Sequence, residues 1–209
     1  AASDVYKRQY QHSYYGFCKM IQRLQSKELL NSFIDPFTRK KYLFLSKLGN
    51  EYLGGKENSE KIERTSLLHT AKVPELTRHF LTLEMFNSVK LKHELKTNPS
   101  PDAILIGKTK KSSIKIAFEL HLGQWARKEI FLNSVLQYIT RDHYDLIILY
   151  FQNTGVLEAF KEWIEERFGI EAHHKIIYAL NDKFISRDFN FDETVVTYNG
   201  RTENIYKLF

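Results

Sequence analysis

The chain has a single cysteine, Cys18, among its 209 residues. One cysteine excludes an internal disulfide, and it also excludes a zinc site built from several cysteines. No apolar run approaches the roughly 20 residues that a helix needs to cross a bilayer, which excludes an integral membrane protein. The first residues show no secretory signal pattern. Together these absences predict a protein of the reducing cytoplasm.

Several familiar catalytic motifs are also missing. There is no glycine-rich phosphate loop, no nucleophile elbow and no zinc-protease motif. The His-hydrophobic-His spacing of the common tyrosine relaxases is absent, because the only adjacent histidines, His173 and His174, would point to opposite faces of a strand. Tyr14 and Tyr15 are therefore poor nucleophile candidates, and we expect both to pack.

What the chain does have is the composition of a folded globular protein, with 43% hydrophobic and 14% aromatic residues. The net charge of +6 is unevenly distributed. Residues 1–49 carry nine Lys and Arg against three Asp and Glu, whereas the remaining 160 residues carry 22 of each sign. A basic segment beside a neutral body indicates a module that binds a polyanion, although a solvated basic surface would look the same.

The basic segment has a recognisable pattern. Residues 1–9 show no periodicity and suggest a truncated end, whereas residues 14–32 have the apolar spacing of an amphipathic helix. Two strand-like runs around a proline turn then predict a hairpin over residues 33–45, and Ser46 is placed to cap a short helix. The basic side chains of the helix and hairpin are Lys19, Arg23, Lys27, Arg39, Lys40 and Lys41.

Residues 54–65 have the composition of a linker, so we expect a module at 1–53 and a second domain at 66–209. In the second domain helical and strand patterns alternate. We expect Pro74 to open a helix that runs to about residue 87. The further helices are expected at 125–140 and around 156–164, and the strands at 89–95, 103–106, 114–121, 145–151, 175–179 and 193–198.

This order predicts an α/β fold with a mixed sheet flanked by helices. The helix at 125–140 would join the strands at 114–121 and 145–151 as parallel neighbours. The polar loop at 108–113 is short and holds three lysines, so it predicts an antiparallel hairpin between the strands on either side of it.

The stretch "SPDAILIGKTKKSSIKIAFELHLGQ" places two acids where chemistry is conceivable. Asp102 begins one strand, Glu119 lies near the end of the next, and His121 shares the face of Glu119 because strand side chains repeat every two residues. An antiparallel hairpin would bring the two carboxyls to the same end of the sheet. Oxygen ligands of this kind suit Mg²⁺ or Mn²⁺, which activate water for phosphodiester hydrolysis. Either acid alone has an ordinary structural reading, as turn chemistry or as an ion-paired edge residue.

Pro-Asp, a strand and then Glu-x-Lys, within the order α-β-β-β-α-β, is the signature of the PD-(D/E)xK or restriction-endonuclease-like superfamily, which this part of the chain resembles. Within it, the chain is similar to the replication-relaxation family and MobC-type plasmid mobilisation proteins. The matching text is "YLFLSKLGNEYL", "LLHTAKVPELTRHFL", "PDAILI" and "IAFELHLGQWARKEIFLNSVLQY". The resemblance implies a winged helix followed by a nuclease-like domain, with catalytic residues Asp102, Glu119 and His121 and a metal held by Asp102 and Glu119.

The chain departs from that pattern at the lysine, where it has His121, and Trp125 stands where the family often has a further basic residue. Histidine can bind water or accept a proton, but it is largely neutral near pH 7. Arg127 or Lys128 are alternative sources of the missing positive charge. Glu84 or Glu94 would be further carboxylates, although each has the ordinary reading of a surface acid.

A winged helix normally has three helices before its wing, and this chain has room for only the last. The resemblance then implies that Lys19, Arg23 and Lys27 face double-stranded DNA, while Arg39, Lys40 and Lys41 contact its phosphates from the wing. Missing helices would leave Phe17, Ile21 and Leu24 partly uncovered. The alternative is that the same amphipathic helix serves dimerisation.

Two hypotheses follow for the whole chain. In the first, it is a plasmid mobilisation or replication protein that binds an origin and nicks the DNA in a metal-dependent reaction. In the second, it is a non-catalytic DNA-binding accessory factor with a degenerate nuclease fold, which recruits other mobilisation or replication proteins. Retention of both carboxylates favours the first hypothesis, and His121 favours the second.

Overall fold

The computed structural model describes residues 14–34, 39–54, 64–92, 95, 100–109, 112–122, 128–140 and 143–209. The chain divides into two compact units, a first unit of residues 1–67 and a second unit of residues 68–209. Most of the linker predicted at 54–65 lies outside the described residues, as do Glu94, Trp125 and Arg127.

The first unit begins with helix α2, Tyr14–Ser26, which is shorter than the helix predicted over 14–32. Glu28 takes a left-handed backbone conformation with φ of 56°. The Leu29 N–H then donates to the Leu24 carbonyl at 3.0 Å, which is the long-range bond of a Schellman helix end. The helix stops there without the glycine that usually marks such an end, which is why the sequence pattern overran it.

A two-stranded hairpin follows, as predicted. Strand β1, Leu30–Ile34, pairs antiparallel with strand β2, Lys41–Leu45. Helix α3, Lys47–Tyr52, comes next. The Ser46 hydroxyl accepts the Gly49 N–H at 2.9 Å, so the predicted helix cap is confirmed.

The apolar side of the first unit is only partly covered among its described residues. No side chain of α2 is fully buried, and Phe17 is 48% exposed. The expectation that Tyr14 and Tyr15 pack is wrong, since they are 85% and 66% exposed. Leu43, Leu45 and Leu48 also stand among the exposed apolar residues. This exposure agrees with a module whose apolar faces need a cover.

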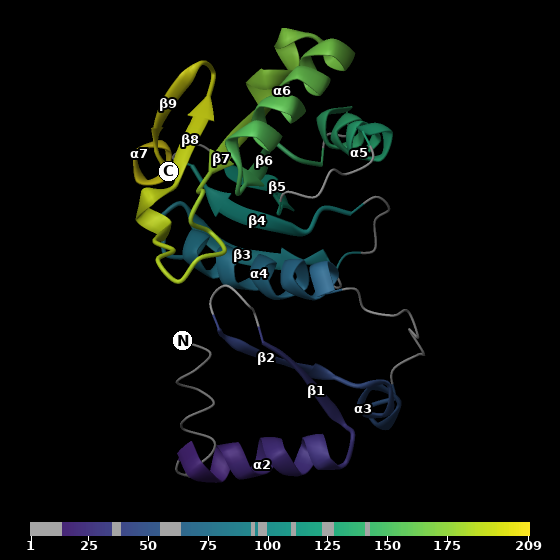
Figure 1. Ribbon diagram of the computed structural model, residues 1–209. Helices are drawn as coiled ribbons and strands as arrows, with labels where there is room; N and C mark the ends of the chain where they lie inside the picture. Colours follow the sequence, from purple (N-terminus) through teal and green to yellow (C-terminus); the bar gives the residue numbers. More distant parts are fainter. Residues whose placement is uncertain are drawn as a thin grey trace. The chain divides into compact units, whose positions relative to one another are not determined.

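The second unit is built on a seven-stranded mixed sheet (Figure 1). Its strands are β3 (Phe86–Leu91), β4 (Ala103–Lys108), β5 (Ser113–His121), β6 (Leu146–Phe151), β7 (Ile176–Leu180), β8 (Val195–Tyr198) and β9 (Arg201–Asn204). They lie in sequence order across the sheet. The central pairs β5–β6 and β6–β7 are parallel, and the outer pairs are antiparallel.

Helices cover both faces of this sheet (Figure 1). Helix α4, Arg64–Phe80, packs Leu76 and Phe80 against one face. Helices α5, Lys128–Thr140, and α6, Thr154–Phe168, pack against the other. Because α5 joins the parallel neighbours β5 and β6, the predicted crossover is confirmed. The mixed α/β fold predicted from the sequence is therefore present.

Pro74 lies inside α4, so the expectation that it opens a helix is wrong. Proline lacks the N–H that would bond back to the preceding turn, a loss that sequence rules treat as a helix boundary. Here the helix continues to Phe80, and the Val73, Leu76 and Phe80 side chains around the proline are buried in the core. Burial of one helix face thus outweighs a local preference.

The C-terminal end holds elements that the sequence reading did not predict. Asn199 and Gly200 both have positive φ, 50° and 73°, and form the tight turn between β8 and β9. The 3-10 helix η2, Ile170–Lys175, contains His173 and His174 and leads directly into β7. A second 3-10 helix, η3 (Phe191–Glu193), precedes β8, and helix α7 (Ile205–Leu208) ends the chain. Within the described ranges, no helix combines the length and the apolar character that crossing a membrane requires.

The core around α4 supplies a test of the fold. Phe80 is fully buried, and its ring lies 5.6 Å from Phe118 and 5.3 Å from Phe191 between centroids. We expect Phe80→Ala to lower the free energy of unfolding by about 3–5 kcal/mol, because the removed ring leaves a cavity. Urea unfolding followed by circular dichroism measures this. Leu81→Ala, at a neighbouring site that is 41% exposed, is the control and should change stability little.

Candidate functional site

The pairing of β4 with β5 brings the two predicted acids together. Ala103 pairs with Phe118 in an antiparallel ladder, so Asp102, one residue before β4, lies across from Glu119. Residues opposite each other in such a ladder share a face of the sheet. The predicted hairpin is therefore confirmed, and it places both carboxyls at the same end of the sheet.

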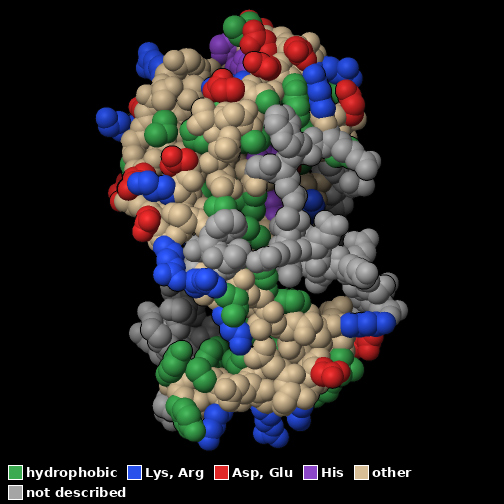
Figure 2. Space-filling model, viewed as in Figure 1, with side chains coloured by type: hydrophobic (Ala, Val, Ile, Leu, Met, Phe, Trp, Pro, Cys, Tyr) green, Lys and Arg blue, Asp and Glu red, His purple; other side chains and the backbone are tan. Residues whose placement is uncertain are grey.

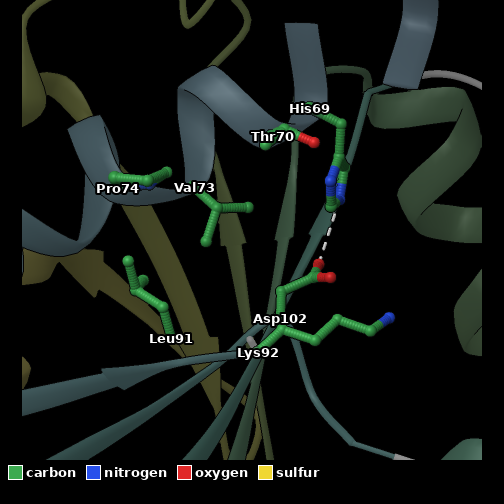
Figure 3. Close-up of a pocket in the computed structure, with 7 residues that line it drawn as sticks. All are labelled: His69, Thr70, Val73, Pro74, Leu91, Lys92 and Asp102. Carbon is green, nitrogen blue, oxygen red and sulfur yellow. Dashed lines mark ion pairs between the residues drawn. The ribbon is translucent and has the colours of Figure 1, made fainter. Parts of the chain in front are cut away.

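The Asp102 side chain is only 7% exposed, and two polar groups hold its carboxylate. The Leu120 N–H donates to Asp102 Oδ2 at 3.0 Å. The Nε2 atom of His69, on α4, lies 3.0 Å from the same oxygen (Figure 3) and 3.1 Å from the Leu120 carbonyl oxygen. These contacts fix the carboxylate at the end of the β4–β5 pair where β4 begins.

The His69–Asp102 pair favours its charged state. Burial acts to lower the pKa of His69, but the hydrogen bond and charge of Asp102 outweigh it and leave the pKa raised. Burial likewise acts to raise the pKa of Asp102, but the hydrogen bond and charge of His69, helped by the Leu120 N–H, bring it below its usual value. Asp102 is thus ionised at neutral pH, and His69 carries a proton more readily than a free histidine.

Glu119 behaves in the opposite way. Burial, and next the negative charge of Asp102, raise the pKa of Glu119 well above its usual value. The Tyr138 hydroxyl, on α5, donates to Glu119 Oε1 at 2.6 Å, which acts against this rise without cancelling it. Two carboxyls in contact cannot both ionise easily, so the negative charge on Asp102 favours the protonated form of Glu119.

His121 occupies the same side of β5 as Glu119, as its spacing predicted, but its ring is packed among aromatic side chains. The ring centroid lies 4.7 Å from Phe160, 5.0 Å from Phe151 and 5.4 Å from Phe131. Burial lowers the pKa of His121 to about 4. Its Nε2 atom is buried and has no hydrogen-bond partner among the described residues. His121 is therefore neutral at physiological pH.

The other residues considered from the sequence lie apart from the acid pair. Lys128 forms an ion pair with Glu166 at 2.7 Å, and its nitrogen lies 5.6 Å from the Trp163 ring centroid. Glu84 precedes β3 at the end that pairs with Gly107, whereas Asp102 lies beyond the opposite end of β4. Glu84 therefore does not reach Asp102 through the strand pairing. Lys128, at the start of helix α5, is held by Glu166 and lies near the Trp163 ring.

Sequence reasoning missed His69 and Tyr138, which hold the two acids in place. His69 lies 51 residues before Leu120 along the chain, and Tyr138 lies 19 residues after Glu119. Neither has a spacing that relates it to the acids. Only the packing of α4 and α5 on opposite faces of the sheet brings them there.

The only protein ligands that this site offers a hard divalent cation are the two carboxyls of Asp102 and Glu119 among the described residues. Among the described residues no group of three or more His, Cys, Asp or Glu side chains is arranged to hold a metal ion. Two carboxyls in contact remain, and Mg²⁺ is commonly bound by one or two carboxylates with water and substrate phosphates completing its shell. A cavity of about 370 Å³ opens beside Asp102 and leaves space for such groups.

The basic residues predicted for DNA contact are exposed in the first unit. Lys19 and Arg23 lie on α2 and Lys27 just beyond its end, and Figure 2 shows Lys and Arg side chains on the surface over α2. Arg39, Lys40 and Lys41 lie at the start of the second hairpin strand. Lys41 Nζ donates to the Gln25 side chain at 3.3 Å, which ties the hairpin to α2.

A scan of the sequence against protein-family models gives no match, and a search of curated proteins gives none either.

The shared proton supplies a test. Glu119→Gln should keep both hydrogen bonds, because the Gln amide can donate to Asp102 and accept from Tyr138. A folded-state pKa above the ordinary 4.5 means that folding takes up a proton, so wild-type stability falls as the pH rises above that value. We expect the variant to match the wild type at low pH and to become progressively more stable than it as the pH rises.

Urea unfolding across a pH series measures the difference in the free energy of unfolding. Glu84→Gln, at an exposed turn position, is the matched control and should show no such trend. A stability difference for Glu119→Gln that stays constant with pH would mean that Glu119 is ionised in the folded protein.

Proposed function

We propose that the chain binds double-stranded DNA through its first unit and that its second unit is a restriction-endonuclease-like domain that nicks DNA with Mg²⁺ or Mn²⁺. The observation that carries the proposal is the position of Asp102 across from Glu119, with both carboxyls in contact at one end of the sheet. Such a protein would act in plasmid mobilisation or replication, as the resemblance of its motifs to the replication-relaxation family implies.

The raised pKa of Glu119 supports a cation at this place. Two carboxyls held together favour either a shared proton or a shared positive ion, because both states remove the repulsion between two negative charges. Asp102 and Glu119 would hold the metal, which would supply an activated water and neutralise charge on the phosphate. Loading the site therefore requires Glu119 to lose its proton, so metal binding should strengthen as the pH rises.

The protein's own residues keep the two acids in position. His69 and the Leu120 N–H both bond Asp102 Oδ2, and the Tyr138 hydroxyl bonds Glu119 Oε1. Asp102 is thus oriented by groups from α4 and β5, and Glu119 is oriented by a group from α5. Groups fixed in this way need little rearrangement when a substrate binds, which is the condition for efficient electrostatic catalysis.

The first unit suits the role of a partial winged helix. Helix α2 would supply the recognition helix and the β1–β2 hairpin the wing, with Lys19, Arg23 and Lys27 on or just after the first element and Arg39, Lys40 and Lys41 on the second. These side chains are exposed on the first unit. Contacts to phosphates would give affinity without sequence choice.

A second candidate function is favoured by one observation, the packing of His121 among three phenylalanines. A neutral histidine with a pKa of about 4 supplies no positive charge to a phosphate at physiological pH. On this alternative the acid pair is a remnant, and the chain is a DNA-binding accessory factor that recruits a separate enzyme. DNA affinity would then be retained without cleavage.

Nicking of a supercoiled plasmid that carries a candidate origin decides between the two. We expect the wild type with Mn²⁺ to convert the plasmid to the open circle. Asp102→Ala and Glu119→Ala should each lower the rate by about 100-fold or more, the scale of losing one group that stabilises transition-state charge. Glu162→Ala, an exposed acid on α6, is the control. Binding without nicking by the wild type would establish the accessory role.

DNA binding by the first unit has its own test. The logarithm of affinity should fall steeply with the logarithm of salt concentration, and replacing Arg39, Lys40 and Lys41 by Ala should reduce that slope by about 1 for each side chain that contacts a phosphate. Fluorescence anisotropy with a labelled duplex measures the slope. The matched control replaces Arg187, Arg201 and Lys207, which are exposed in the second unit. Equal slopes for both triple variants would contradict this interface.

A further inference from the structure

A nuclease site needs positive charge from the protein as well as two carboxylates, because the phosphate gains negative charge during hydrolysis. Position 121, where the resemblance places a lysine, is a histidine whose ring is packed against Phe131, Phe151 and Phe160 and brings no lysine side chain to the site. Lys128 is engaged by Glu166 and by the Trp163 ring. Of the cations considered above that lie in the described part of the chain, only His69 contacts the acid pair, through Asp102.

Lys92 is placed to supply that charge. It follows the last residue of β3, and its backbone N–H donates to the Asp102 carbonyl at 3.0 Å, which fixes its Cα beside the acid. Its side chain is exposed, and Figure 3 shows it running past Asp102 with its nitrogen on the side toward which the carboxylate points.

The positive charge of Lys92 acts on both acids, Asp102 and Glu119. Burial is the largest influence on the pKa of both Asp102 and Glu119, but the positive charge of Lys92 also acts to lower each of them. The same charge acts against protonation of His69. Lys92 is thus electrostatically part of the site although it follows another strand, β3.

Lys92 also lines the cavity of about 370 Å³ beside Asp102 (Figure 3). The polar side of the cavity is formed by Lys92, Asp102 and His69, and its apolar side is formed by Val73, Pro74 and Leu91. A nucleotide has the same two characters, a charged phosphate and a largely apolar sugar and base face. A pocket of this size falls within the range that small ligands occupy.

We propose that Lys92 contacts a phosphate of bound DNA in this cavity and supplies beside Asp102 and Glu119 the positive charge that residue 121 lacks. The inference rests on the proposed function, since it takes DNA as the ligand. To the proposed function it adds Lys92 as a DNA-contacting residue and the cavity as a binding site. It also implies that DNA approaches the second unit from the side of α4 and β3.

Chemical footprinting tests the contact without relying on cleavage. The full chain is treated with an amine-acetylating reagent in the presence of EDTA, with and without a short DNA duplex, and acetylation of each lysine is followed by mass spectrometry. We expect DNA to slow acetylation of Lys92 several-fold. Lys108, which is exposed and ends β4 at its far end from Asp102, is the internal control and should be unaffected. Equal acetylation of Lys92 with and without DNA would overturn the proposal, whatever the nicking assay shows.

Nicking by variants tests the supply of charge. Lys92→Ala should lower the nicking rate by about 100-fold, Lys92→Arg should restore much of it, and Lys108→Ala should match the wild type. Protection of Lys92 by DNA together with full nicking by Lys92→Ala would reject the charge-supplying role. A wild type that does not nick would reject cleavage and the charge-supplying role alike, and the footprint would still decide whether Lys92 meets the phosphate.

Discussion

The backbone ladder between β4 and β5 is the interaction on which the candidate site depends. Side chains in paired strands meet only in the register that the hydrogen bonds set, and a slip of one residue would send Glu119 to the opposite face. The register is supported beyond the strand itself, because the Leu120 N–H bonds the Asp102 carboxylate where regular pairing ends. The Leu120 N–H thus extends the hydrogen-bonding between the two strands by one bond to the Asp102 side chain, and the same bond positions the Asp102 carboxylate.

Burial of two acids in contact has an electrostatic cost that the structure meets in two ways. Asp102 stays charged because His69 and a backbone N–H compensate it, and Glu119 stays neutral because nothing of equal strength does so. The result is an asymmetric pair made from two chemically similar groups. At this end of the sheet the charge of Asp102 is met by His69, which comes from helix α4.

The sequence contained enough to predict the hairpin, the crossover and the cap at Ser46, since each depends on residues close together in the chain. It was insufficient where distant contacts decide. Glu28 ends α2 in a conformation that glycine usually takes, and Pro74 stays inside α4 because the helix buries an apolar face. His69 and Tyr138 approach the acids only through packing across the sheet.

The hydrogen bond from Tyr138 gives helix α5 a part in the chemistry of the strand below it. The Tyr138 hydroxyl bonds whichever form of Glu119 is present, and the ring lies 5.6 Å from that of Tyr144 between centroids, in the segment that leads into β6. Exchange of the Glu119 proton for another positive ion would change what this hydroxyl meets. A single hydrogen bond therefore joins helix α5 to the acid pair, so a change at position 138 acts directly on Glu119.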